Sequence, residues 1–191
     1  MNEVVGNIDK LREIALEQHG YVTTQQALDV GVSKRALSDL TKRERLKRVV
    51  FGVYRVPQVP YTQHNAFMLA VLWTGVPEAV ISHETALDMY DVSDINPTKI
   101  FVTVGKNRRI RRKGGEHYVV HRQDLQSDQI GWQDEIPSVN LPTAIEQCIE
   151  SDVPTYLLNQ AIERGRARGL LTVDEEKYLE EKLEERSGRY K

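Results

Sequence analysis

The sequence predicts an α+β protein, in which a small N-terminal domain precedes a larger domain of mixed helices and strands. Within residues 1–56, two short helical patterns about two residues apart are followed by two β-prone runs, which is the layout of a winged helix-turn-helix. Prolines in the run YRVPQVPY at 54–61 indicate an extended connector, because a residue before proline avoids the helical region. We therefore expect a winged helix-turn-helix over 1–56 and a mixed α+β domain over 57–191.

The first two helices of the N-terminal domain have recognisable ends. Apolar residues recur at helical spacing over 8–15, and Gly20 ends that helix. Thr23 and Gln26 have the spacing of a capping box, which opens a second, short helix. Gly31 ends this second helix.

A third helix is the most informative segment. Ser33 is placed to cap it. Its apolar face is formed by Ala36, Leu37 and Leu40. The opposite face presents side chains that can donate hydrogen bonds to guanine edges and phosphates from a helix in the major groove: Lys34, Arg35, Ser38 and Lys42. A solvated helix face with the same residue types is the alternative interpretation.

The two β-prone runs that follow, 46–49 and 53–56, carry further positive charge around Phe51-Gly52. On a DNA-binding protein these side chains would meet phosphates, which position a protein without specifying sequence: Arg43, Arg45, Lys47, Arg48 and Arg55. Thr23 and Thr24 at a helix N-terminus fit a phosphate contact and a plain cap equally well.

The second domain is expected to alternate helices and strands. Helical patterns occupy 65–73, 82–90, 142–149, 154–168 and 173–186, and strand patterns occupy 99–104 and 117–121. Proline at the first turn supports the helices that start near 142 and 154, and Thr172 is placed to cap the last one. The two strands are expected to form a hairpin around a basic loop.

The distribution of charge matters more than the formal net charge of −2. Residues 31–55 hold eight basic and two acidic residues, and 99–122 hold eight basic and one acidic residue, whereas 57–98 and 123–150 contain no Lys or Arg. Local fields decide the choice of partner within a Debye length. The six basic residues within 106–113 favour a polyanion, and a mobile solvated loop is the alternative.

The sequence shows no catalytic or metal-binding constellation. The single cysteine, Cys148, excludes a disulfide framework and fits a core thiol in the reducing cytoplasm. Adjacent helical residues at 82–84 cannot align as a hydrolase triad, so we expect Ser82 to be a helix N-cap. On one strand, His117 and His121 would lie about 13 Å apart, too far to share an ion.

Other sequence patterns exclude further functions. There is no glycine-rich phosphate loop and no carboxylate cluster after the strand at 99–104, which ranks a nuclease-like second domain below the other interpretations. No apolar run approaches the roughly 20 residues that a membrane span requires. We therefore expect a protein that is not an enzyme and has no cofactor, metal or membrane association.

Several segments resemble AbiEi-type antitoxins, which are transcriptional regulators of type IV (abortive-infection) toxin–antitoxin systems. The N-terminal match is GYVTTQQALDVGVS at 20–33, continuing through Leu46-Lys-Arg-Val to Gly52-Val-Tyr54. In the second domain the matching pieces are ISHETA at 81–86, IFVTV at 100–104, the basic stretch to Lys113, and Ile136-Pro137 followed by Pro142-Thr143. The resemblance covers roughly residues 8–175.

The resemblance implies an antitoxin that represses its own operon by binding inverted repeats in double-stranded operator DNA. It also implies a cognate nucleotidyltransferase-like toxin, and it associates the C-terminal domain with antitoxicity. Carried onto this chain, DNA contact falls on Ser33, Lys34, Arg35, Ser38, Lys42 and Arg48. The basic face of the second domain maps to Arg108, Arg109, Arg111, Arg112 and Lys113. A monomer that binds each repeat and a preformed dimer are equally compatible with the sequence.

Two positions depart from the family pattern. Glu44-Arg45 stands where the family often has glycine, and Val50-Phe51 stands where the wing tip is often basic. A hydrophobic tip argues against a phosphate contact by the wing and favours packing of Phe51 on the domain. A different class of function also stays open: a winged helix that binds protein, with the second domain sequestering a partner and residues 106–113 meeting an acidic surface.

Overall fold

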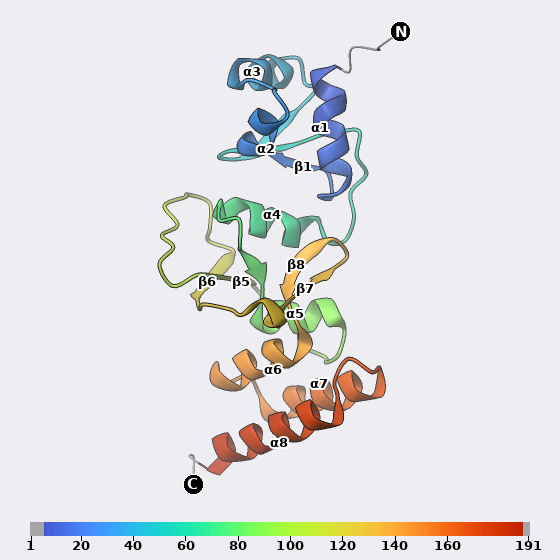
Figure 1. The fold of residues 1–191 in the computed structure, drawn as a ribbon, viewed down its shortest axis with the longest axis vertical. Helices are drawn as coiled ribbons and strands as arrows, with labels where there is room; N and C mark the ends of the chain where they lie inside the picture. The colour runs from blue at the N-terminus through green and yellow to red at the C-terminus, as the bar shows by residue number, and fades with distance from the viewer. Residues whose placement is uncertain (1–5, 189–191) are drawn as a thin grey trace. The chain divides into compact units, whose positions relative to one another are not determined.

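A computed structural model describes residues 6–188 and shows a mixed α+β protein (Figure 1). The chain divides into two compact units. The first unit runs to Pro77 and also takes in Arg109–Gly115, and the second consists of Glu78–Arg108 and the chain from Glu116 onward. The change of unit therefore comes after Pro77, whereas the proline-rich connector led us to expect it at residues 56–57.

The first unit contains helices and one antiparallel sheet. Its elements in chain order are α1 (Asn7–Leu16), β1 (Tyr21–Thr23), α2 (Thr24–Asp29), α3 (Lys34–Lys42), β2 (Lys47–Val50), β3 (Val53–Arg55) and α4 (Asn65–Thr74). The sheet has the order β1-β3-β2, with both pairings antiparallel. The helices and the two later strands were predicted, whereas the three-residue strand β1 was not.

The predicted helix caps of the first unit are confirmed. The Thr23 backbone N–H donates to Gln26 Oε1 (2.9 Å), and the Gln26 N–H donates to Thr23 Oγ1 (3.2 Å), which completes a capping box. At the start of α3, Ser33 Oγ accepts from the Ala36 N–H at 3.1 Å. Leu37 of α3 is buried in a core that it shares with Leu11, Val22, Ala27, Val32 and Leu46.

The second unit combines a five-stranded sheet with helices. Its strands are β4 (Val80–Ile81), β5 (Ile100–Val104), β6 (Tyr118–Arg122), β7 (Ile130–Gln133) and β8 (Ile136–Val139), in the order β6-β5-β4-β8-β7. Its helices are α5 (His83–Tyr90), the 3-10 helix η1 (Ser127–Gln129), α6 (Leu141–Glu150), α7 (Thr155–Ala167) and α8 (Val173–Gly188). The sequence predicted the α-helices, β5 and β6, but not the short strands β4, β7 and β8.

Strands β5 and β6 run parallel, and the expected hairpin is wrong. Ile100 lies beside Tyr118 and Val104 lies beside Arg122 in a continuous parallel register. A tight turn cannot join parallel strands, because the end of one strand is far from the start of the next. Residues 105–117 are therefore a crossover connection rather than a hairpin loop.

The helices of the second unit bury apolar faces. In α6, Ile145 and Cys148 are fully buried, so the predicted core thiol is confirmed. Burial, with a smaller effect from the charge of Glu84, raises the pKa of the Cys148 thiol far above its usual range. Within residues 6–188, no helix has both the length and the apolar character needed to cross a membrane.

Truncation of Leu37 tests how α3 is held. Because Leu37 is 1% exposed, Leu37→Ala leaves a cavity beneath the helix and is expected to lower the free energy of unfolding by about 2–5 kcal/mol. Ser38→Ala on the neighbouring exposed face is the matched control, with an expected change within about 0.5 kcal/mol. Urea unfolding measures both variants, and equal stabilities would contradict the placement of Leu37.

Candidate nucleic-acid interface

Helix α3 presents its polar face to solvent. The Ser33 N-cap exposes its side chain, and Leu37 turns inward. Four further side chains on the helix that can donate are exposed, as the spacing predicted: Lys34, Arg35, Ser38 and Lys42. The acidic Asp39 is exposed on the same helix. The helix therefore offers a row of hydrogen-bond donors held on a buried apolar stripe.

The hairpin β2–β3 follows α3 and adds more exposed cations. Lys47 and Arg48 of β2 are exposed, and so is Arg43 at the end of α3. Glu44 has a φ of +57° and so takes the left-handed conformation that glycine adopts most easily. Glu44 stands where the family often has glycine, and its side chain makes this left-handed backbone conformation strained.

Thr23 and Thr24 have internal partners. Thr23 is the N-cap of α2, and the Thr24 N–H donates to the Gly52 carbonyl at 2.9 Å. The Thr24 hydroxyl also donates to that carbonyl, at 3.4 Å. The structure thus accounts for both threonines as local supports, one for a helix and one for the β2–β3 turn.

Arg55 is an exception among the expected phosphate contacts, because it lies in the interior. It is 2% exposed. Its guanidinium donates to the carbonyls of His19 (3.2 Å) and Val59 (2.6 Å) and lies 3.6 Å from the centre of the Tyr61 ring. Because Arg55 is buried, bonded to two carbonyls and stacked on an aromatic ring, it holds the corner after α1 against the connector and is not available to phosphate.

The basic stretch after β5 joins the first unit rather than the second. The Arg112 Nη1 donates to the carbonyls of Leu72 (3.3 Å) and Trp73 (3.0 Å) at the end of α4, where a cation complements the helix dipole. The Trp73 ring N–H donates to the Lys113 carbonyl at 2.9 Å. A Cβ on Gly115 would lie 2.4 Å from the Trp73 ring, so the glycine permits close packing. These contacts anchor a segment that the sequence allowed to be a mobile loop.

The remaining cations of that stretch differ in their surroundings. Arg109, Arg111 and Lys113 are exposed on the first unit. Arg108 belongs to the second unit and forms an ion pair with Glu78. Hydrogen bonding to Arg108 lowers the pKa of the Glu78 carboxyl. Arg112 is half-buried, and desolvation lowers the pKa of its guanidinium.

The two units carry opposite formal charges. The first unit holds fourteen basic and seven acidic residues, a formal charge of +7, whereas the second holds twelve and twenty-one, a formal charge of −9. Both basic blocks of the sequence contribute to this excess, because Arg109, Arg111, Arg112 and Lys113 belong to the first unit. The near-neutral total thus combines one strongly positive body and one strongly negative body.

The tip of the β2–β3 hairpin is apolar and exposed. Phe51 is 71% exposed, so the expectation that it packs on the domain is wrong. Its ring lies 5.4 Å from the guanidinium carbon of Arg48. No sequence signal separates a packed aromatic tip from a projecting one, because the distinction depends on how the turn is held.

Residues 9–57 match the model of a family described as a transcriptional regulator, AbiEi antitoxin. This range runs from α1 through β3 and contains all of α3 and the hairpin.

The crystal structure of the RV2827C protein from Mycobacterium tuberculosis is similar over most of the chain. The TM-score is 0.52 at 11% sequence identity, and the match covers 93% of this chain and 72% of that one. At this identity the likeness is one of fold. Among curated proteins, none matches the chain at a significant level.

Outside the AbiEi-like region, the second unit contains a buried polar cluster at the start of α5. Ser82 occupies the N-cap position without a side-chain cap bond, and its hydroxyl instead accepts from Thr103 Oγ1 at 2.8 Å. Ser82 Oγ also lies 3.0 Å from the His83 Nδ1. The two neighbours meet because His83 has a φ of +53° and so departs from helical geometry. Both are buried, so this contact is structural.

His83 stacks on His121 with 3.7 Å between the ring centres. Burial, and then the charge of His121, lowers the pKa of His83 to about 3. Burial also lowers the pKa of His121. Both rings are therefore neutral near pH 7 in the folded protein, and they are poor candidates for acid–base chemistry at a surface site.

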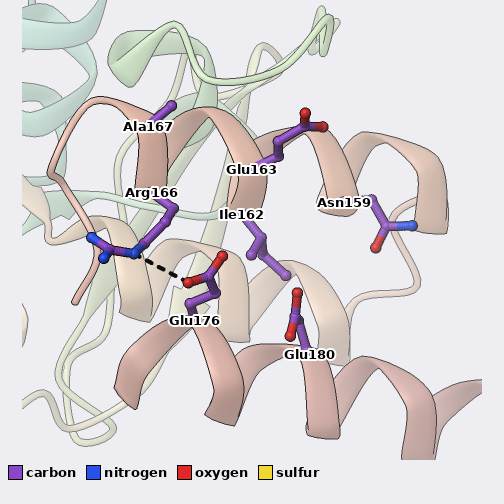
Figure 2. Close-up of a pocket in the computed structure, with 7 residues that line it drawn as sticks. All are labelled: Asn159, Ile162, Glu163, Arg166, Ala167, Glu176 and Glu180. Atoms are coloured by element: carbon purple, nitrogen blue, oxygen red, sulfur yellow. Dashed lines mark ion pairs between the residues drawn. The ribbon is translucent and has the colours of Figure 1, made fainter. Parts of the chain in front are cut away.

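A cavity of about 470 Å³ lies between α7 and α8, with Arg166 and Glu176 paired at 3.1 Å (Figure 2). Figure 2 shows further carboxylates of Glu163 and Glu180 at this cavity. Its lining residues include no histidine, cysteine or serine. Within residues 6–188, no group of three or more His, Cys, Asp and Glu side chains is arranged to hold a metal ion.

Replacement of Arg55 tests whether this buried cation stabilises the fold. Arg55→Ala removes the donor to the Val59 carbonyl and is expected to lower the free energy of unfolding by about 1–3 kcal/mol. Arg48→Ala is the matched control in the same hairpin, and its stability is expected to stay within about 0.5 kcal/mol of wild type. An Arg55→Ala protein as stable as Arg48→Ala in urea unfolding would contradict the structural role.

The stacked histidines predict a stability that depends on pH. His83 has a pKa of about 3 in the folded state and takes up a proton near pH 6.5 when unfolded. The unfolded state therefore binds more protons between these values, and the free energy of unfolding falls as the pH drops below about 6.5, by up to about 1.4 kcal/mol per pH unit for His83.

His83→Asn tests this dependence, because asparagine tolerates the left-handed backbone at this position. Urea unfolding at pH 7 and pH 5 should show a smaller loss of stability in the variant than in wild type. Both proteins contain the same carboxylates, so the pH-dependent change in stability that these groups cause drops out of the comparison. An identical loss in the two proteins would show that His83 is not buried in its neutral form.

Proposed function

We propose that the chain is a DNA-binding antitoxin that represses its own toxin–antitoxin operon. In this proposal the first unit is a winged helix-turn-helix that binds inverted repeats in double-stranded operator DNA. The protein counteracts a nucleotidyltransferase-like toxin in the cytoplasm, and it catalyses no reaction and needs no cofactor. The match of residues 9–57 to the AbiEi antitoxin regulators supports the regulatory class of function.

The observation that carries the proposal is the exposed donor face of α3 on a unit of formal charge +7. A helix of this kind fits the major groove, where arginine and lysine recognise guanine. The order of helices and strands supports a winged helix, since α2 and α3 precede the antiparallel hairpin β2–β3. In this assignment α3 is the recognition helix and the hairpin is the wing.

The contacts fall into two kinds. In this proposal Lys34 and Arg35, near the start of α3, read base edges together with Ser33 and Ser38. We assign the phosphate contacts to cations at the end of α3, on the wing and on the basic segment of the first unit: Lys42, Arg43, Lys47, Arg48, Arg109, Arg111 and Lys113. Arg108, paired with Glu78, is a weaker candidate on the other unit.

The second unit is a candidate for contact with protein. Its formal charge of −9 disfavours DNA. Among its residues up to 188, it exposes three large aromatic side chains of the kind enriched at protein interfaces: Trp132, Tyr156 and Tyr178. This observation favours a second candidate function, in which the protein sequesters a partner directly. Co-purification with the product of a neighbouring gene, at a salt concentration that abolishes DNA binding, separates this function from repression.

Two arginine variants test the DNA contacts. Arg35→Ala is expected to weaken binding to the DNA upstream of the gene by roughly 1–3 kcal/mol and to relax base preference, whereas Arg109→Ala should weaken binding to all sequences alike and reduce the salt slope by about 1. Fluorescence anisotropy across a salt series measures both quantities. Lys177→Ala on α8 is the control, because its side chain is 76% exposed on the acidic unit.

The control should bind like wild type. The proposal fails if the wild-type chain has no salt-dependent affinity for DNA. It fails equally if the protein with both arginines replaced binds as tightly as wild type.

A further inference from the structure

The tip of the β2–β3 hairpin is a short, tight turn. Val50 pairs with Val53 across the strands, which leaves only Phe51 and Gly52 to reverse the chain. Gly52 takes a φ of +74°, which a residue with a side chain adopts only with strain. The Phe51 side chain therefore projects from the end of the hairpin with 71% of its surface exposed.

The backbone of this turn is held from two directions. The Gly52 carbonyl accepts from the backbone N–H of Thr24 at 2.9 Å and from its hydroxyl at 3.4 Å. The Phe51 carbonyl accepts from the Arg112 Nη1 at 3.4 Å. The same guanidinium nitrogen donates to the Trp73 carbonyl at 3.0 Å, so Arg112 ties the turn to α4. A turn bonded to α2 and to α4 holds the backbone of Phe51 in place, so less backbone freedom is lost on binding.

The surroundings of the projecting ring are cationic. Arg48 lies beside the ring with its guanidinium carbon 5.4 Å from the ring centre, and Arg111 and Lys113, exposed, flank the Arg112 that holds the turn. A single exposed phenylalanine is ordinary on a protein surface. An exposed aromatic side chain among cations instead fits DNA. The cations face its phosphates, and the ring faces the stacked bases that are reached through the minor groove.

We propose that Phe51 is an apolar wedge that enters the minor groove, unstacks one base step and bends the operator. Arg112 is the positioning residue that keeps the wedge extended. This inference rests on the proposed function, because α3 must first place the wing on DNA. It adds a source of specificity that α3 does not supply, since flexible pyrimidine–purine steps unstack more easily than stiff A-tracts.

The experiment uses the full chain and a duplex from the DNA directly upstream of its gene. A fluorescent adenine analogue placed at successive positions reports unstacking, and dyes on the two ends report bending by energy transfer. Wild type should raise the analogue's fluorescence at one step per repeat and shorten the end-to-end distance. Phe51→Ala should abolish both signals and weaken binding roughly tenfold, the scale of one lost base contact. Phe51→Leu should retain both signals, because leucine is also an apolar wedge.

Arg112→Met tests the positioning role, because methionine keeps an apolar side chain but offers no donor to the three carbonyls that surround the Arg112 Nη1. Its bend should shrink while the variant stays folded at the assay temperature and keeps its sensitivity to Arg35→Ala. The wedge is overturned if Phe51→Ala bends and unstacks the duplex like wild type, or changes only the oligomeric state. The proposed function fails on a different result, namely if the protein with both Arg35 and Arg109 replaced binds DNA as tightly as wild type.

Discussion

The parallel pairing of β5 with β6 is the constraint on which the interface depends. Parallel strands cannot be joined by a turn, so residues 105–117 must leave the sheet and return to its other end. Part of that excursion, Arg109–Gly115, folds as part of the first unit. Arg112 fixes it through the carbonyls at the end of α4, and the Trp73 ring N–H holds the Lys113 carbonyl. The topology of one unit thus delivers four cations to the other.

This exchange explains how a chain with a net charge of −2 can carry the positive surface proposed to bind DNA. The first unit has a formal charge of +7 and the second −9. Salt-dependent attraction to phosphates is a property of the local field, which falls off within a Debye length. One unit is therefore suited to nucleic acid, and the other, with its exposed aromatic residues, is suited to protein.

Local signals in the sequence predicted most of the helices and their caps, because a cap such as Thr23 with Gln26 involves residues three apart. The donor face of α3 followed from the spacing around Leu37. Strands of two to four residues, such as β4, leave too short a pattern to recognise. The burial of Arg55 depends on Val59 and on a Tyr61 ring that covers it, and the sequence alone does not reveal which cations are so engaged. The parallel pairing that moves Arg112 into the first unit is a non-local contact of the same kind.

In the proposed function, α3, the wing and the segment 109–113 form one surface for DNA. Amide hydrogen exchange of the full chain, with and without a duplex from upstream of its gene, tests it most directly. We expect DNA to slow exchange in 33–48 and in 109–113 together, while α7 and α8 exchange as before. Protection confined to 33–48, or protection that falls on the second unit, would contradict it.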